Sequence, residues 1–289
     1  MALKNLEHVE VCQIVNYWEI NQKVEKNVNP VYKASIKVQT KDQQPTQPYT
    51  EMAYIKFIDP WKIYAECVSA IVGRALGLPI PQPMIGLLKT GVTPPPGLPE
   101  NSGIETPVFV SIDMKHPSVR NLITNHSTAI QDNKLGKQYA AKLRKWSKLL
   151  EAGSFDEFIA NNDRQFGNLL YEKDNSFFLI DHELAIPKNL VQDEKNQANH
   201  LYTLYTDNEI GKKLAIKKTP AICKPYQSFT AAEVKSKTLC TEYISDIKHI
   251  DQSLIALYNR AQQLTSILLE YTAQAKDGQL SLSYHETTT

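Results

Sequence analysis

The strongest constraint on the fold is a change in the character of the sequence near residue 115. Up to that point, short runs of β-branched and aromatic residues alternate with polar stretches, which is typical of antiparallel strands. Beyond it, helix-forming residues dominate, and no strongly strand-like run appears until residue 169. This order predicts an α+β protein with two lobes and a cleft between them: a β lobe at residues 1–113 and a mainly helical lobe at residues 114–289.

We expect the first lobe to contain an antiparallel sheet of about five strands and one helix. Asp59 occupies the position of a helix N-cap, and Pro60 suits the first helical turn. The apolar face that follows stops at Gly77 and Pro79, so the helix should have about four turns. The strand-like runs are found at residues 9–18, 31–40, 52–58, 84–88 and 105–114.

A β-hairpin is predicted inside the helical lobe. The apolar runs NLLY and FFLI flank EKDNS, which is rich in turn-forming residues. Ser154 and Glu157 have the spacing of a capping box and predict a short helix at residues 155–160, just before the polar string NNDRQFGN. The hairpin then places NNDRQFGN before its first strand and DHE after its second strand, on the same side.

A heptad pattern of apolar residues runs from Tyr243 to Tyr271 and predicts a long helix near the carboxyl end. Further apolar residues, among them Ile244 and Ile267, widen the apolar face beyond a narrow coiled-coil seam. We therefore expect this helix to pack on its own lobe. Self-association through the helix is the alternative.

The composition is that of an ordinary globular chain, and it narrows the possible partners. Of the 289 residues, 42% are hydrophobic and 22% are charged, and 32 Lys and Arg against 31 Asp and Glu give a net charge of +1. Without a positive field, nucleic acid is not expected as a partner, and an anionic lipid surface is disfavoured. The four cysteines are widely spaced, and no apolar run is long enough to span a bilayer. We expect a reduced, soluble, cytoplasmic protein without a removed leader.

The polar string before the hairpin carries the first candidate catalytic residues. Asp163 and Asn168 lie five positions apart in it, and Asp181 follows the second strand of the hairpin. Phosphoryl transfer uses one carboxylate to align and deprotonate the attacking hydroxyl, and a second carboxylate with an amide oxygen to bind Mg²⁺ on the nucleotide phosphates. An Asp, an Asn five residues later and another Asp beyond a hairpin is the spacing of protein-kinase-like enzymes.

Two upstream residues fit the same template. Lys56 lies on a predicted strand, where alternation sets it opposite Ile55 and Phe57, and Glu66 lies on the next helix ten residues later. A strand lysine steadied by a helix glutamate can hold its ammonium over the α- and β-phosphates of a nucleotide. Each residue alone has an ordinary explanation as a turn or a solvated charge. All of these residues together, in the order expected for a kinase, favour a catalytic function.

Other chemistries lack their motifs. The sequence contains no G-x-S-x-G elbow of a serine hydrolase and no G-x-x-x-x-G-K-S/T phosphate loop. Its histidines do not have the spacing of zinc ligands. We expect His182 to make a structural hydrogen bond to nearby backbone, and Glu183 to be a helix or turn charge.

Four segments together resemble the HipA-like kinases: YIKF, YAECVSAIVGRALGLPIPQP, FDEFIANNDRQFGNLLY and FFLIDHELAI. The likeness is to the shorter branch of that family, in which a glutamate helix leads into LGLP and a proline-rich strand. In that branch a D-R-x-x-G-N string precedes I-D-H, and the same two patterns are similar to those of phosphatidylinositol kinases. The resemblance implies a protein-kinase-like fold, with ATP as the substrate and Mg²⁺ as the cofactor.

The resemblance also implies a role for each candidate residue. Asp163 is then the catalytic base, and Asn168 and Asp181 bind Mg²⁺. Lys56 contacts phosphate, and Glu66 orients Lys56. An arginine directly after the catalytic Asp, here Arg164, agrees with the family as well.

We therefore expect an ATP-dependent kinase that transfers the γ-phosphoryl group of ATP to a hydroxyl, with Ser or Thr of a protein as the acceptor. Kinases usually cover the phosphates with a glycine-rich hairpin, but residues 16–38 contain no glycine. A pseudokinase or scaffold that binds a partner protein is therefore the alternative. A lipid or small-molecule kinase on the same fold is a third possibility, and the sequence leaves the oligomeric state open.

Overall fold

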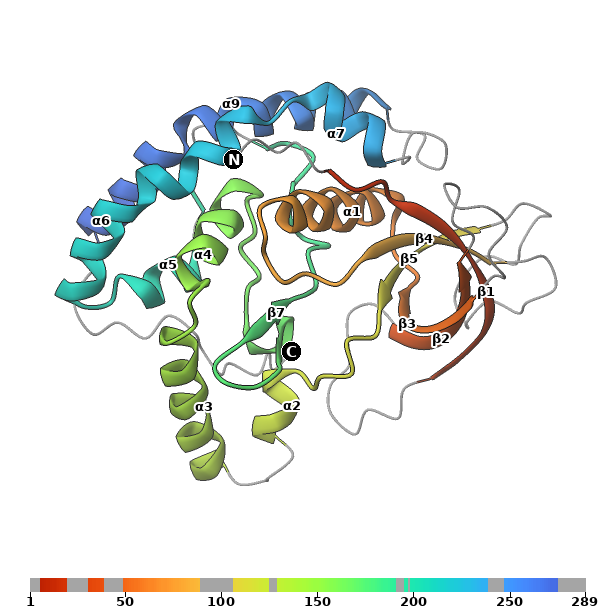
Figure 1. Cartoon of the computed structure of the whole chain (residues 1–289), viewed down its shortest axis with the longest axis horizontal. Helices are drawn as coiled ribbons and strands as arrows, with labels where there is room; N and C mark the ends of the chain where they lie inside the picture. Colours follow the sequence, from red (N-terminus) through yellow and green to blue (C-terminus); the bar gives the residue numbers. More distant parts are fainter. Residues whose placement is uncertain are drawn as a thin grey trace.

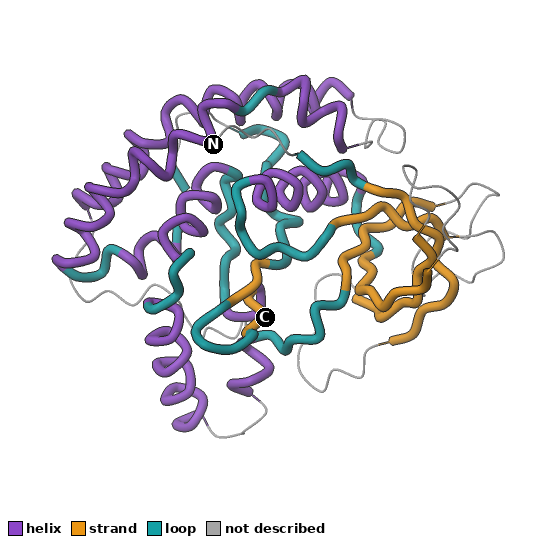
Figure 2. The backbone as a smooth tube through the Cα atoms, viewed as in Figure 1, coloured by secondary structure: helices purple, strands orange, loops and turns teal. Residues whose placement is uncertain are grey.

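The structure, a computed structural model of the chain, describes residues 6–19, 31–38, 49–88, 106–124, 129–190, 195–196, 198–238 and 247–274. A β-barrel forms one end of the molecule, and helices form most of the rest (Figures 1 and 2). The predicted order of strands followed by helices is confirmed, and the predicted boundary at residue 113 falls between the last barrel strand and the helices. The division into two lobes stays a prediction.

The barrel contains the five strands that the sequence indicates: β1 (Glu10–Glu19), β2 (Val31–Val38), β3 (Tyr49–Lys56), β4 (Pro83–Leu88) and β5 (Thr106–Ile112). Their order around the barrel is β1-β2-β3-β5-β4, and the barrel is closed because β4 also pairs with β1. Closure pairs both edge strands and so removes the unpaired edges of an open sheet.

The prediction of a wholly antiparallel sheet is wrong for one pair of strands. β1 and β4 are parallel, with Glu10 opposite Met84 and Gln13 opposite Leu87. The other four pairs are antiparallel. The helix between β3 and β4 is a crossover long enough to return the chain in the direction of β1, and strand patterns alone do not reveal this neighbour.

The helix after β3 begins and ends as predicted. α1 (Pro60–Ala75) has Asp59 as its N-cap, whose side chain accepts a hydrogen bond from the backbone nitrogen of Trp61 at 2.8 Å. Gly77 follows the helix with a φ of 76°, which suits glycine because it has no Cβ. α1 contacts β4, β5 and a later helix, so it packs between the barrel and the helical part.

The barrel has an apolar interior of its own. Side chains of β2 alternate between buried and partly exposed, as expected for a strand with one face toward a core. A separate and larger core includes the buried face of α1 and the helices of the second part. The interior cluster of the barrel consists of Cys12, Ile14, Tyr32, Ala34, Ile36, Val38, Ala53, Ile55, Phe57, Met84, Leu88, Val108 and Val110.

The helical part contains a short β-hairpin. Its elements are α2 (Val119–Thr124), α3 (Ala129–Arg144), α4 (Leu149–Phe158), η1 (Phe166–Asn168), β6 (Leu169–Tyr171), β7 (Phe177–Leu179), α5 (His200–Tyr205), α6 (Glu209–Cys223), η2 (Lys224–Ser228), α7 (Ala231–Thr238) and α9 (Ile247–Gln274). β6 and β7 pair antiparallel, which confirms the predicted hairpin. No helix in the described segments is long and apolar enough to cross a membrane.

The predicted capping box at Ser154 is wrong. α4 begins at Leu149, and Ser154 lies inside it with its hydroxyl donating to the carbonyl oxygen of Leu150 at 2.8 Å. Nine of the ten residues of α4 are buried. The helix therefore lacks the alternation of polar and apolar faces from which its first residue could be predicted.

The long helix near the carboxyl end packs on its own chain, as predicted. α9 contacts α4, α6 and α7, and its predicted heptad positions Leu254, Leu257 and Leu264 are buried in the larger core. Tyr243, the first residue of the heptad pattern, lies outside the described residues. Self-association through this helix stays an alternative prediction.

Replacing Gly153 with Ala should destabilise the fold. Gly153 lies on α4 where α5 comes closest, and a Cβ there would lie 2.6 Å from the backbone nitrogen of Tyr202. The backbone of Tyr202 cannot move aside as a flexible side chain can. We therefore expect the clash to outweigh the roughly 1 kcal/mol by which Ala is favoured over Gly in a helix. The expected net loss in free energy of unfolding is on the order of 1–3 kcal/mol, measured by urea denaturation.

Gly167→Ala is the matched control. A Cβ at Gly167 would meet the guanidinium of Arg120 at 3.6 Å, an ordinary contact, so the unfolding midpoint should stay close to that of the natural chain. Equal stability of the two variants would contradict the close packing of α4 on α5.

Candidate active site

The hairpin brings two distant loops together. Because β6 and β7 are antiparallel, the residue before β6 and the residues after β7 meet at the same end of the hairpin. The backbone nitrogen of Ile180 donates to the carbonyl oxygen of Asn168 at 3.2 Å. Asn168 and Asp181 are therefore neighbours, as the sequence predicts.

Arg164 fixes both loops to α4. Its side chain is completely buried, and its guanidinium binds the carboxylate of Asp156 with nitrogen–oxygen distances of 2.8 to 3.3 Å. The remaining nitrogen, Nη1, donates to the carbonyl oxygens of Asn168 at 3.0 Å and Ile180 at 2.7 Å. This arginine therefore sets the positions of the two residues that were predicted to bind metal, a role that sequence reasoning did not find.

Asp163 and Asn168 contact each other directly. The amide nitrogen of Asn168 donates to the carbonyl oxygen of Asp163 at 2.6 Å and to its carboxylate at 3.3 Å. The amide oxygen of Asn168 is then the atom that can bind a cation. Gln165 donates to the other carboxylate oxygen of Asp163 at 3.3 Å, which further fixes this side chain.

Asp163 has the electrostatic character of a base. Burial raises the pKa of its carboxyl above the ordinary value, and the negative charge of Asp181 raises it further, against the hydrogen bond from Asn168. A raised pKa increases the affinity of a carboxylate for a proton, which suits a group that accepts one from a hydroxyl.

Lys56 lies at the centre of a cluster of carboxylates. Its ammonium is 2.7 Å from Glu66 on α1, 2.5 Å from Asp181 and 3.4 Å from Glu183. Its flanking residues Ile55 and Phe57 are buried in the barrel, so strand alternation directs Lys56 outward toward the loop after β7, as predicted. The structure thus joins the predicted Lys56–Glu66 pair to the predicted metal loop.

The charges in this cluster stabilise one another. Burial alone would lower the pKa of Lys56, but the attraction of Glu66, Asp181 and Glu183 outweighs it and raises the pKa above its ordinary value. Burial alone would raise the pKa of Glu66, but Lys56 and His182 lower it to about 2. The lysine is therefore positively charged and Glu66 negatively charged at neutral pH.

Glu66 also holds the loop that contains Asp181. Its second oxygen, Oε2, accepts a hydrogen bond from the backbone nitrogen of His182 at 2.9 Å and lies 3.5 Å from the ring nitrogen Nδ1 of the same residue. The expected bond from His182 to nearby backbone is not what the structure shows, because the ring faces this carboxylate. Burial lowers the pKa of His182, so its ring is neutral at pH 7.

The loop after β7 has a strained backbone at two places. Asp181 has a φ of 62° and Ile186 a φ of 51°, both in the left-handed region that residues with a Cβ rarely adopt. Ile186 is held there because its nitrogen donates to Ile159 at 2.8 Å and its carbonyl accepts from the indole of Trp61 at 2.9 Å. Such strain concentrates at functional sites, where surrounding contacts maintain it.

Glu183 belongs to the site, although the sequence suggested only a helix or turn charge. Its carboxylate contacts Lys56 at 3.4 Å and Lys62, in the first turn of α1, at 3.3 Å. The sequence does place it two residues after Asp181, but only the fold brings it within reach of the barrel and α1.

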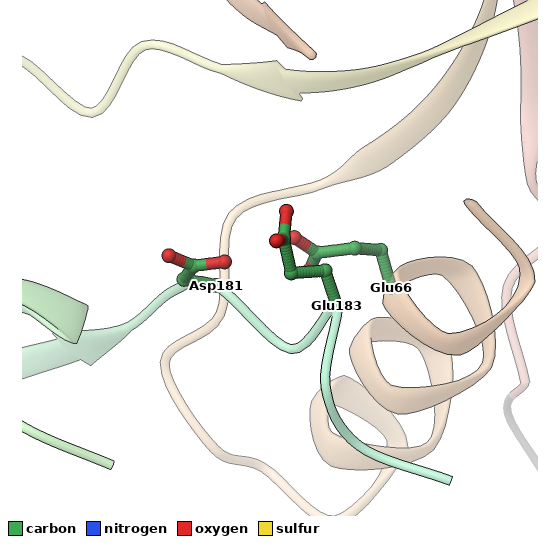
Figure 3. A group of neighbouring side chains, drawn as sticks. All are labelled: Glu66, Asp181 and Glu183. Carbon is green, nitrogen blue, oxygen red and sulfur yellow. The ribbon is translucent and has the colours of Figure 1, made fainter. Parts of the chain in front are cut away.

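The donor set fits a hard divalent cation. Carboxylate oxygens of Glu66, Asp181 and Glu183 lie within 4.8 Å of one another, and Figure 3 shows Glu66 extending from α1 toward the other two. These three carboxylates face the two ammonium groups of Lys56 and Lys62, which leaves one negative charge in excess. Asp163 adds a further carboxylate close enough to Asp181 and Glu183 that their charges raise its pKa. Oxygen ligands with this excess charge are what Mg²⁺ prefers.

The chain is similar in fold to solved structures but matches no known family by sequence. No protein-family model matches the chain, and no curated protein matches it. Among solved structures, the chain is similar to the crystal structure of a Helicobacter pylori proinflammatory kinase, CtkA, with 13% sequence identity and a TM-score of 0.46. The match covers 91% of this chain and 98% of that one. A likeness this distant carries no weight for function, which depends on the side chains described above.

Replacing Asp156 with Asn should destabilise the protein strongly. The change leaves the guanidinium of Arg164 buried without its counter-charge, and breaking a buried pair in this way costs about 3–5 kcal/mol. Urea denaturation measures the loss. Asp251→Asn is the control, because Asp251 forms a partly exposed pair with Lys235 that is worth about 1 kcal/mol or less. A similar, small effect of both changes would contradict the role given to Arg164.

Proposed function

We propose that this chain is an ATP-dependent phosphotransferase of the HipA-like kinase type, which transfers the γ-phosphoryl group of ATP to a hydroxyl. One observation carries the proposal: Lys56 of the barrel contacts Glu66 and Asp181 at the same point, beside the loop that contains Asp163 and Asn168. A strand lysine paired with a helix glutamate, next to an acidic loop and an Asp/Asn loop, is the arrangement that phosphoryl transfer from a nucleotide requires.

Lys56 binds the nucleotide phosphates in this proposal. Glu66 keeps its ammonium in place, and Asp181 can release it when a phosphate with greater negative charge arrives. Because Glu66 also accepts from the backbone of His182, the position of the lysine and that of the loop after β7 are set by the same carboxylate. Lysine suits the role because it presents a compact charge to phosphate oxygens.

Asn168 and Asp181 would hold the Mg²⁺ that accompanies ATP. Both are fixed by the single guanidinium of Arg164, through the carbonyl oxygen of Asn168 and that of Ile180 next to Asp181. When bound, the ion supplies charge neutralisation on the phosphoryl group during transfer. The residues themselves supply one carboxylate and one amide oxygen in fixed positions.

Asp163 aligns the acceptor hydroxyl and takes its proton. The hydrogen bonds from Asn168 and Gln165 orient the carboxylate, and burial together with the charge of Asp181 increases its proton affinity. Proton acceptance by a positioned side chain contributes about 10²- to 10⁴-fold to a rate. We propose Ser or Thr of a protein as the acceptor, with a lipid headgroup or small metabolite as the alternative on the same fold.

A pseudokinase that binds a partner without turnover is the second candidate. One observation favours it: residues 16–38, which include the end of β1 and all of β2, contain no glycine that would let a backbone loop approach the phosphates closely. The complete set of Lys56, Asp163, Asn168 and Asp181 favours the enzyme. Transfer of labelled phosphate decides between the two.

Asp163→Asn should reduce phosphoryl transfer at least 100-fold while leaving nucleotide affinity nearly unchanged, since the base acts on the acceptor and not on the nucleotide. The measurements are incorporation or release of phosphate from γ-labelled ATP with Mg²⁺, and binding of a fluorescent ADP.

Asp174→Asn is the matched control. It removes an exposed carboxylate in the turn of the hairpin, where a φ of 49° is one that Asn tolerates, and it should leave transfer unchanged. Substantial transfer by Asp163→Asn would refute the assignment of the base. Nucleotide binding without any transfer by the natural chain would favour the pseudokinase.

A further inference from the structure

Two lysines from different elements converge on one carboxylate. Oε2 of Glu183 lies 3.4 Å from Nζ of Lys56 on β3, and Oε1 lies 3.3 Å from Nζ of Lys62 on α1. The side chains of Lys56 and Glu183 are each 13% exposed, and that of Lys62 is 27% exposed. The two ammonium groups are therefore already arranged around a small anion with two oxygens.

We propose that Lys62 is a second phosphate-binding residue, and that Glu183 takes the place of a phosphate group between Lys56 and Lys62 when no nucleotide is bound. The inference rests on the proposed function, because it assigns further residues to the same nucleotide site. Glu183 is then an internal competitor of the nucleotide, and Lys62 contributes to affinity for phosphate.

Charge explains why a phosphate would displace Glu183. A terminal phosphate group carries more negative charge than a carboxylate and offers three acceptor oxygens where a carboxylate offers two. Lys56 keeps its contact with Glu66 throughout, but Lys62 has no carboxylate besides Glu183 among the ion pairs of the described residues. Exchange of Glu183 for phosphate therefore keeps both lysines paired.

The amino-acid sequence also favours a contribution of Lys62 to phosphate binding. With no glycine in residues 16–38, close backbone contacts to the phosphates are harder to make, so cationic side chains must supply more of the binding. Lys62 precedes Glu66 by one helical turn on α1, so the helix that orients Lys56 also carries the second lysine.

A purely structural role for Lys62 makes a different prediction. If Lys62 served only to hold Glu183, its removal would have no effect on nucleotide binding once Glu183 was gone. If Lys62 binds phosphate, its removal weakens nucleotide binding whether Glu183 is present or not. The double variant separates the two roles.

Isothermal titration with ADP and with adenosine, each in EDTA and again with Mg²⁺, tests the proposal in the full chain. Lys62→Gln should weaken ADP binding about tenfold and leave adenosine binding unchanged, since only ADP carries phosphates. Glu183→Gln should tighten ADP binding in EDTA, because the competing anion is gone. Lys62→Gln should weaken ADP binding in the Glu183→Gln background as well.

Lys173→Gln, which removes an exposed lysine in the turn of the hairpin, is the charge control and should bind ADP like the natural chain. The proposal is overturned if Lys62→Gln has no effect on ADP in the Glu183→Gln background, or if it weakens adenosine as much as ADP. Looser ADP binding by Glu183→Gln in EDTA would also overturn it.

The variant Lys56→Gln shows whether a negative result concerns only the role of Lys62 or the proposed function as a whole. If Lys56→Gln weakens ADP binding and Lys62→Gln does not, only the role of Lys62 is wrong. If the natural chain binds no ADP, or if Lys56→Gln binds it normally, the nucleotide site itself is wrong and both proposals fail.

Discussion

The buried guanidinium of Arg164 is the contact on which the candidate site depends. It joins the carboxylate of Asp156 on α4 to the carbonyl oxygens of Asn168 and Ile180, so one rigid side chain sets the spacing of both loops. A fully buried charge is costly unless it is paired and hydrogen-bonded, and here each of the three nitrogens of the group has a partner. The buried charge serves to position the amide of Asn168 and the carboxylate of Asp181. An apolar side chain at this position would form no hydrogen bond to either loop.

Electrostatic repulsion within the site is balanced by Lys56. Three carboxylates with oxygens within 4.8 Å of one another would repel strongly, and the ammonium of Lys56 offsets this repulsion. The one negative charge that remains after Lys56 and Lys62 are counted, together with the nearby carboxylate of Asp163, makes the site receptive to a divalent ion. The same lysine links the barrel to α1 through Glu66 and to the hairpin through Asp181. The site is therefore assembled from three separate parts of the chain by charge as well as by packing.

Local patterns in the sequence predicted what depends on local geometry. The N-cap at Asp59, the outward direction of Lys56 and the β6–β7 hairpin follow from turn chemistry and side-chain periodicity, and they are confirmed. The start of α4 was not predicted because the helix is buried on nearly all sides. The parallel pairing of β1 with β4 was not predicted because the alternation of residues in a strand does not indicate which strand pairs with it. Glu183 was missed for a further reason: its contact with Lys56 joins residues 127 positions apart, which no motif in a single sequence reports. The roles of Asp163, Asn168 and Asp181 in chemistry stay predictions.

The most direct test of the account is anomalous diffraction from crystals grown with ADP and Mn²⁺, which replaces Mg²⁺ at oxygen-rich sites. The account predicts an anomalous peak bonded to the amide oxygen of Asn168 and the carboxylate of Asp181, with the ammonium of Lys56 on a phosphate of ADP. A peak that touches neither residue, or an ordered nucleotide away from Lys56, would contradict it.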